Sequence, residues 1–242
     1  MNHRRIVTSV LICLLIPLSL LSGCTEFSTQ DLGGILGRDT PLDEQTVAAG
    51  LKEALRVGTE RTVDSTSMID GFLGNTLIRI VMPEQFEDVA SVLRDVGFGQ
   101  QVTNFETAMN RAAERSAGEA KDVFWNAVTS MSVADAFGIL KGHDTAATEY
   151  FHGRTETELR SRFHPIVKNK MSEVGLYQMY NELTDYYNKI PLKTAPALDL
   201  DDYITEHALN GLFTVLGQEE KKIRDDPLAR TTDLLKRVFK EQ

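Results

Sequence analysis

Cysteine is nearly absent from this chain. Its 242 residues include two, Cys13 and Cys24, and no thiol lies beyond residue 24. The region after Cys24 therefore cannot form an internal disulfide, and it can supply neither a cysteine nucleophile nor a thiolate ligand for a metal. The fold has to be stable without a disulfide, even in a compartment that would permit one.

The sequence also lacks the short motifs of several enzyme classes. It contains no Gly-x-Ser-x-Gly of serine hydrolases, no Gly-rich phosphate loop and no Gly-x-Gly-x-x-Gly of dinucleotide-binding domains. The histidines show no spacing typical of zinc ligands, and no acidic run has the glycine and distal glutamate of a calcium loop. We therefore expect no metal and no cofactor.

Basic side chains are outnumbered by acidic ones. Lys and Arg total 26 against 35 Asp and Glu, a net charge of −9. Residues 1–23 hold two of the arginines and no acidic side chain, so the rest of the chain has 24 basic and 35 acidic residues, or −11. An acidic surface repels phosphate groups, so we expect no nucleic-acid partner and no binding to anionic lipid through a basic face.

The N-terminus has the order of a secretory signal peptide. A basic start at His3–Arg5 precedes an apolar run over Ile6–Leu21, and the small residues Ser22 and Gly23 precede Cys24. The apolar run is shorter than the roughly 20 residues that a membrane-spanning helix needs. Leu-Ser-Gly-Cys at the cleavage junction resembles the lipobox of bacterial lipoproteins.

The lipobox predicts where the protein works. In lipoproteins of this type the cysteine thiol receives a diacylglyceryl group, the chain is cleaved before the cysteine, and the new amine takes a fatty acyl chain such as palmitate. Several chains on Cys24 would make attachment effectively permanent, since each buried CH₂ contributes about 0.8 kcal/mol. Thr25 stands where an aspartate would favour the inner membrane. We therefore expect the periplasmic face of the outer membrane.

The rest of the chain divides into two parts. Residues 24–42 are polar and contain several glycines, so they are expected to be a flexible tether. Residues 43–242 follow helical periodicity almost throughout, which predicts an all-α, compact single domain of about nine or ten helices. The apolar run at 77–82 is the exception, and a short two-stranded β element there remains an open alternative.

Several helix starts are predicted from capping residues. Ser132 with Asp135, and Thr155 with Glu158, have the spacing of a side-chain cap at a helix N-terminus. Asp144 is expected to cap a separate short helix between these two. The chain is thus predicted to consist of short to medium helices with short connections.

The ends of the chain and one stop signal add further predictions. Asp43 is expected to cap the first helix, and Gly97 to end the helix that begins near Pro83. A last helix is expected over residues 228–239.

Five short runs together resemble a known family. In chain order they are Gly50–Leu55, Asp70–Asn75, Met109–Glu114, Asp144–Phe151 and Ala229–Leu235. In order and spacing they are similar to the bacterial family catalogued as domain of unknown function 4197. The resemblance implies a mostly helical periplasmic or lipoprotein domain. It brings no established activity, and therefore no catalytic residue.

Two groups of polar residues could carry chemistry. Glu106, Asn110 and Glu114 are four residues apart and share one stripe of a predicted helix, with Arg111 beside them. Two carboxylates with an amide and a guanidinium could divide acid and base roles or bind a polar ligand. The competing interpretation is that these boundary residues pair with neighbouring helices.

The second group surrounds Asp144. Thr148 and Tyr150 follow it closely and could bind a ligand, whereas Asp144 itself is also explained as a helix cap. The catalytic candidates are thus Glu106, Glu114 and Asp144. The candidates for ligand binding are Asn110, Arg111, Thr148 and Tyr150.

These observations favour a non-enzymatic lipoprotein, whose helical domain is held by lipid on Cys24 and binds an envelope protein, an envelope polymer or a small ligand. The alternative is a hydrolase or lyase of envelope glycan that uses Glu106 with Glu114, or Asp144. A structural assembly subunit, with a large exposed apolar patch, is a third class. An open cleft joining these carboxylates would favour an enzyme, whereas local pairing would count against one.

Overall fold

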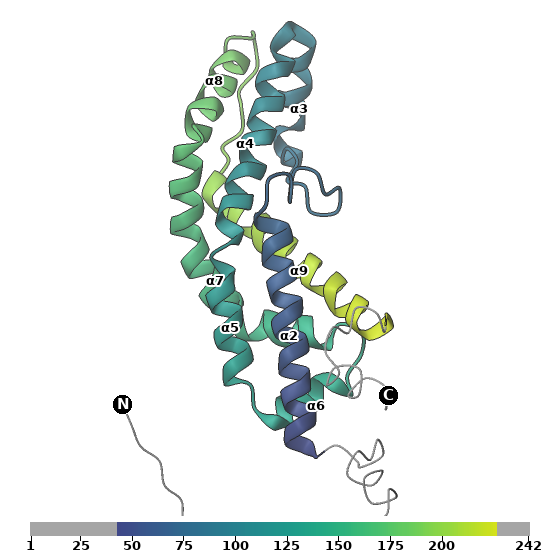
Figure 1. Ribbon diagram of the computed structural model, residues 1–242. Coiled ribbons are helices and arrows are strands. Elements are labelled where there is room, and N and C mark those ends of the chain that lie inside the picture. Colours follow the sequence, from purple (N-terminus) through teal and green to yellow (C-terminus); the bar gives the residue numbers. More distant parts are fainter. Residues whose placement is uncertain (1–42, 227–242) are drawn as a thin grey trace, which may run out of the picture. The chain divides into compact units, whose positions relative to one another are not determined.

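The computed structural model describes residues 43–226, which are mostly helical and contain no strand (Figure 1). The α-helices are α2 (Glu44–Ser67), α3 (Glu84–Leu93), α4 (Gly99–Ala117), α5 (Ala120–Ser130), α6 (Val133–Leu140), α7 (Ala146–Glu173), α8 (Leu176–Asn188) and α9 (Leu200–Asp225). A π-helical link, η1 (Arg94–Phe98), joins α3 to α4. The all-α prediction is confirmed, although the described residues form fewer than nine or ten helices.

Three predicted segments lie outside the described residues. They are the signal peptide at 1–23, the tether at 24–42 with its lipidation site Cys24, and a helix expected over 228–239. Within residues 43–226, no single helix is both long and apolar enough to cross a membrane. One bent pair, Glu84–Ser130 with Val133–Leu140, meets that test by length and composition only.

Helix α7 accounts for part of the lower number of helices. The sequence predicts two helices here, one capped by Asp144 and one by Thr155 with Glu158, but the structure has one helix over Ala146–Glu173. Thr155 is buried inside it, and its hydroxyl donates to the carbonyl of Phe151 at 2.7 Å. The predicted capping box is therefore wrong, because a threonine inside a helix can satisfy its hydroxyl on the preceding turn.

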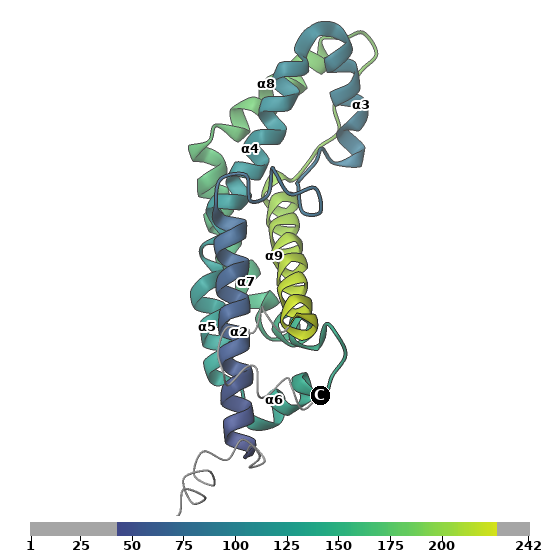
Figure 2. The same cartoon turned by 45° about the vertical axis from the view of Figure 1, so that its right-hand side comes forward.

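Local sequence signals predict several other helix boundaries correctly. Asp43 accepts a hydrogen bond from the N–H of Thr46 at 2.8 Å, and Ser132 with Asp135 forms a complete capping box at the start of α6. Gly97 has a φ of +96°, in the left-handed region that favours glycine. There the chain turns from α3 into α4 (Figure 2). The sequence predicts a cap or a stop at each of these places.

The apolar run at 77–82 is an irregular connection that begins in a turn, and it is not part of a sheet. Its backbone is held by a side chain of α4. The Asn110 amide accepts from the N–H of Ile80 at 2.9 Å and donates to the carbonyl of Ile80 at 2.7 Å. The predicted two-stranded element is therefore wrong, because one buried amide supplies both bonds that a neighbouring strand would make.

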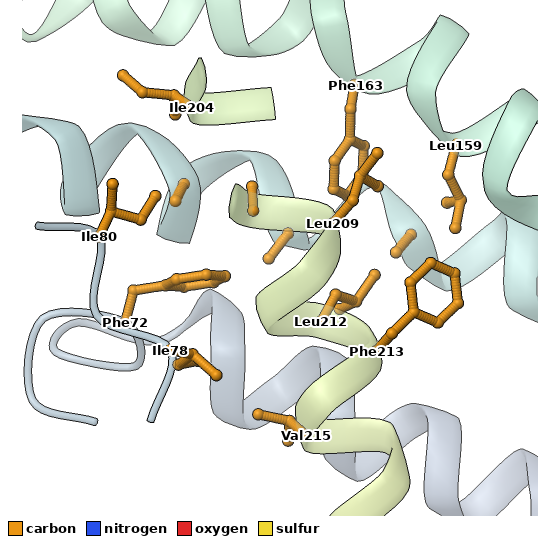
Figure 3. Packing of buried hydrophobic residues seen from close by; sticks show 14 of the residues in the cluster. Phe72, Ile78, Ile80, Leu159, Phe163, Ile204, Leu209, Leu212, Phe213 and Val215 are labelled. Carbon is orange, nitrogen blue, oxygen red and sulfur yellow. The ribbon is translucent and has the colours of Figure 1, made fainter. Parts of the chain in front are cut away.

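Helix α9 lies in the middle of the hydrophobic packing. It contacts α2, α4 and α7, and its residues Leu209 and Phe213 face the side chains of α7 (Figure 3). On another side, Phe72 and Ile78 of the α2–α3 connection lie against it (Figure 3). All these side chains belong to one continuous buried cluster. The α2–α3 connection is therefore part of the core although it is not helical.

Gly211 marks the closest approach of this connection to α9. A Cβ at this position would lie 2.6 Å from a ring carbon of Phe72 and 3.2 Å from the Cβ of Ile78. We expect Gly211→Ala to destabilise the protein by about 1–3 kcal/mol through overpacking, despite the better helix propensity of alanine. Thermal denaturation measures this. Gly153→Ala is the matched control, since its Cβ would enter open space on α7. A Gly211→Ala protein as stable as this control would contradict the prediction.

Candidate functional site

Glu114 on α4 is a deeply buried member of the predicted site, with 3% of its side chain exposed. Its Oε1 accepts hydrogen bonds from the backbone N–H groups of Phe72 and Leu73, both at 3.2 Å. Its Oε2 accepts from Nη1 of Arg111 at 2.6 Å. Both carboxylate oxygens therefore bind groups of the chain itself, and together they hold the start of the α2–α3 connection.

Arg111 extends this contact to the surface. Its Nη2 donates to Oδ1 of Asp70 at 2.7 Å, so one guanidinium joins the buried carboxylate of Glu114 to an exposed one. The hydrogen bond from Glu114, followed by that from Asp70, raises the pKa of the Arg111 guanidinium above its ordinary value. Asp70 has a φ of +66°, which is uncommon for a residue other than glycine. The cross-link thus secures a tight turn at Asp70.

Asn110 lies one turn before Glu114 and is fully buried. Besides its two bonds to Ile80, its Nδ2 donates to the carbonyl of Glu106 at 2.8 Å. Its side-chain atoms are thus bound to backbone groups of the same chain. Asn110 holds the end of the α2–α3 connection as Glu114 holds its start, so one face of α4 fixes the connection at two points.

The segment fixed in this way carries much of the exposed apolar surface, and we call residues 68–81 the apolar loop. Half of the eight exposed large apolar side chains among residues 43–226 lie on it, with 53–75% of each exposed. They are Met68, Ile69, Leu77 and Val81. Other apolar side chains of the same loop, Phe72, Ile78 and Ile80, are buried in the core. The loop is therefore anchored by its buried side chains, and four large apolar side chains lie on its exposed side among polar ones.

The remaining carboxylate candidates have local surroundings. Glu106 pairs with Arg94, at the junction of α3 and η1, at 2.9 Å. Asp144 is exposed and precedes α7 in the chain. The N-cap residue of this helix is Thr145, whose side chain makes no capping hydrogen bond. Asp144 therefore does not cap α7 as predicted. Among residues 43–226, no hydrogen bond or ion pair joins Asp144 to Glu106 or Glu114.

The cap of α7 comes from a residue that local capping rules do not identify. Glu220 on α9 accepts from the N–H groups of Ala147 at 2.9 Å and Thr148 at 2.8 Å, and also from the Thr148 hydroxyl at 2.8 Å. Arg224 pairs with Glu220 at 2.8 Å. A carboxylate at a helix N-terminus satisfies free N–H groups and complements the helix dipole. Thr148 is therefore part of a structural cap.

One sequence signal points to Glu220. It lies four residues after Leu216 and three before Ile223, on the buried stripe of α9. A carboxylate on an apolar stripe has to find polar partners inside the protein, because burial of an unpartnered charge is unfavourable. The stripe thus indicates that Glu220 has an internal role, but it does not say with which segment.

Tyr150 is the candidate that faces a hollow. It lines a space of about 330 Å³ between α5 and α7, together with Asn126, Arg154 and Glu158. Its hydroxyl donates to Asp135 at 3.4 Å. Burial, and then the negative charge of Asp135, raise the pKa of Tyr150 above its ordinary value. Tyr150 is thus a neutral hydrogen-bonding group at the edge of this hollow.

These contacts decide what the predicted site can do. A general acid or base has to reach the substrate with a free side-chain atom, whereas Glu114 and Asn110 are bound to the backbone of the apolar loop. Among residues 43–226, no three His, Cys, Asp or Glu side chains gather as metal ligands would. Local pairing of this kind favours a binding surface over a pair of catalytic carboxylates.

Comparison with known proteins agrees with the resemblance seen in the sequence. The family model described as protein of unknown function (DUF4197) matches residues 41–240. This range includes every described helix, the two residues Asn110 and Glu114 that hold the apolar loop, and Glu220. No curated protein and no solved structure matches the chain. Because the family model matches most of the chain, the chain belongs to the family of proteins of unknown function DUF4197.

Proposed function

We propose that this protein is a lipid-anchored binding module of the bacterial cell envelope, which recognises a protein partner through the apolar loop. One observation supports this most strongly. The exposed apolar side chains of the loop stand on a backbone that the buried Glu114 and Asn110 hold in one conformation. The polar residues that resemble an active site thus serve to position a binding surface.

Rigid presentation favours binding in two ways. Exposed apolar side chains that gather on one segment gain free energy when a partner removes them from water. A loop that is already fixed loses little conformational entropy on binding, so more of that free energy remains as affinity. Loops held by a rigid scaffold are also where binding residues are commonly found.

The neighbouring surface suggests the chemistry of the partner. An open hollow of about 790 Å³ lies beside the end of the loop, lined by residues 81–85 and by Glu87, Tyr203 and His207. The Tyr203 hydroxyl donates to the carbonyl of Val81 at 2.9 Å and so ties the loop to α9. Glu84 and Glu87 make this rim acidic, and the Glu87 charge adds to burial in raising the pKa of Tyr203. We therefore expect a protein segment with apolar residues flanked by basic ones.

The N-terminus would determine where in the cell the protein meets its partner. Lipid on Cys24 would hold the protein to the membrane, and residues 24–42 would separate the domain from the lipid. The periplasmic face of the outer membrane is the expected location. The alternative, a hydrolase or lyase of envelope glycan, gains no support from the contacts of Glu114, since both of its oxygens bind the protein itself.

Site-specific photo-crosslinking in intact envelopes tests this proposal. A crosslinking residue at Leu77 should capture one protein, whereas the same residue at Leu192, an exposed leucine outside the loop, should not. Leu77→Asp should reduce co-purification of that protein by about tenfold, which is about 1.4 kcal/mol, without a change in thermal midpoint. Leu192→Asp is the matched control. A product that forms equally from both positions, or that contains two copies of this chain, would contradict a foreign partner at the loop.

A further inference from the structure

The single tryptophan of this chain is half exposed. Trp125 on α5 has 49% of its surface accessible and lines a hollow of about 210 Å³ between α2 and α5. The other residues of this hollow are Arg56, Thr59, Glu60, Lys121 and Asp122. An exposed aromatic face beside charged groups combines an apolar body with hydrogen-bonding partners, which is the arrangement of a ligand site.

The α2 wall of the hollow is rigid. Arg56 is bound to Glu53 at 2.7 Å and to Glu60 at 2.8 Å, and these partners raise the pKa of its guanidinium. Thr59 is buried and donates its hydroxyl to the Arg56 carbonyl at 3.0 Å. A ligand in the hollow would therefore meet a wall whose side chains are already held in place.

The α5 wall is different, because its polar groups are available. Lys121 and Asp122 come four and three residues before Trp125, so both lie on its side of the helix. Within residues 43–226, neither side chain has a hydrogen bond or an ion pair. One donor and one acceptor thus line the hollow together with the indole ring.

We propose that this hollow binds a sugar ring. The face of a pyranose that carries C–H groups packs on an aromatic ring, while its hydroxyls donate to a carboxylate such as Asp122 and accept from an ammonium such as Lys121. The volume is below the roughly 300 Å³ at which pockets for drug-sized ligands begin, so it suits one ring. Arg56 and Lys121 balance Glu60 and Asp122, and this balance favours a neutral ligand over an anion.

The site is separate from the apolar loop, and neither proposal depends on the other. A sugar ring of this kind can belong to a free oligosaccharide or to an envelope glycan strand. Because Trp125 is the single tryptophan, its fluorescence reports on this hollow alone. A negative result here would leave crosslinking from Leu77 unchanged, so the two proposals can fail separately.

The test uses the full chain in a detergent that has no sugar head group. The trisaccharide of N-acetylglucosamine and maltotriose are titrated while tryptophan emission is recorded, and isolated peptidoglycan sacculi are used for co-sedimentation. We expect a saturable change in emission with at least one sugar, at a Kd of about 1 mM for so shallow a site. Binding to trisaccharide and sacculi identifies envelope glycan, and binding to trisaccharide alone identifies a free sugar. The proposal is overturned if neither sugar changes the tryptophan emission and the protein does not co-sediment with the sacculi.

Variants separate the site from an indirect effect. Asp122→Asn should weaken binding about fivefold, because an amide replaces the charged acceptor, whereas Glu119→Gln, an exposed carboxylate of the same segment outside the hollow, should have no effect. Trp125→Ala should abolish binding measured by calorimetry, with an unchanged circular dichroism spectrum. Equal affinities of Asp122→Asn and Glu119→Gln, or binding by Trp125→Ala, would show that the sugar does not occupy this hollow.

Discussion

Replacement of Glu114 by alanine is expected to lower the free energy of unfolding by about 3 kcal/mol. The substitution leaves the N–H groups of Phe72 and Leu73 without their acceptor, and Phe72 is buried. It also removes the ion pair between Glu114 and Arg111. Because the Arg111 side chain is partly exposed, this pair contributes less to stability than the two backbone hydrogen bonds. Urea denaturation followed by circular dichroism measures the change.

A control on the same helix isolates this effect. Glu106→Ala removes a carboxylate whose ion pair with Arg94 is partly exposed, so it should cost about 0–1 kcal/mol. Limited proteolysis gives a second readout, because a loop that has lost its anchor should be cleaved within residues 68–81 faster than in the natural protein. Equal stability of the two variants would show that Glu114 does not hold the apolar loop.

Cys24→Ser is expected to abolish lipid attachment, which is the largest change in behaviour that one side chain can cause here. A hydroxyl is a much weaker nucleophile than a thiolate, so the diacylglyceryl group cannot be transferred. Without it, the cleavage that depends on lipidation should also fail, and an unlipidated precursor should accumulate. Metabolic labelling with a palmitate analogue, read by gel mobility and mass spectrometry, measures both steps.

Cys13→Ser is the matched control for this experiment. Cys13 lies in the predicted signal peptide, so its loss should leave labelling and processing intact. A processed Cys24→Ser protein that still fractionates with membranes would contradict the lipobox assignment. Loss of the label in Cys13→Ser would contradict it as well.

Local sequence patterns predicted much of the fold correctly. Helical periodicity indicated an all-α protein, and the Ser132–Asp135 cap and the stop at Gly97 lie where expected. These features depend on residues within one or two turns of each other, so their physics is contained in a short stretch of sequence. The same reasoning was wrong at Thr155, where a cap and an internal helical position use the same hydroxyl.

The candidate site shows the limit of this reasoning. The spacing of Asn110 and Glu114 correctly placed them on one face of a helix, but their partners are Ile80, 30 residues away, and Phe72, 42 residues away. Glu220 caps α7 from a distance of 73 residues. A carboxylate near an apolar stripe has the same local pattern whether it faces a substrate or a backbone N–H group, so spacing alone could not decide between these roles.

The sequence by itself determined the helical class, the family and several helix boundaries, and it predicts the anchor at Cys24, because each of these follows from short-range patterns of residue type. Only the tertiary structure decided what the polar side chains do. It placed Glu114 and Asn110 against the apolar loop, gave the cap of α7 to Glu220, and put Trp125 at the edge of a hollow. The reason is physical: a buried polar group is satisfied by whichever segment the packing brings to it.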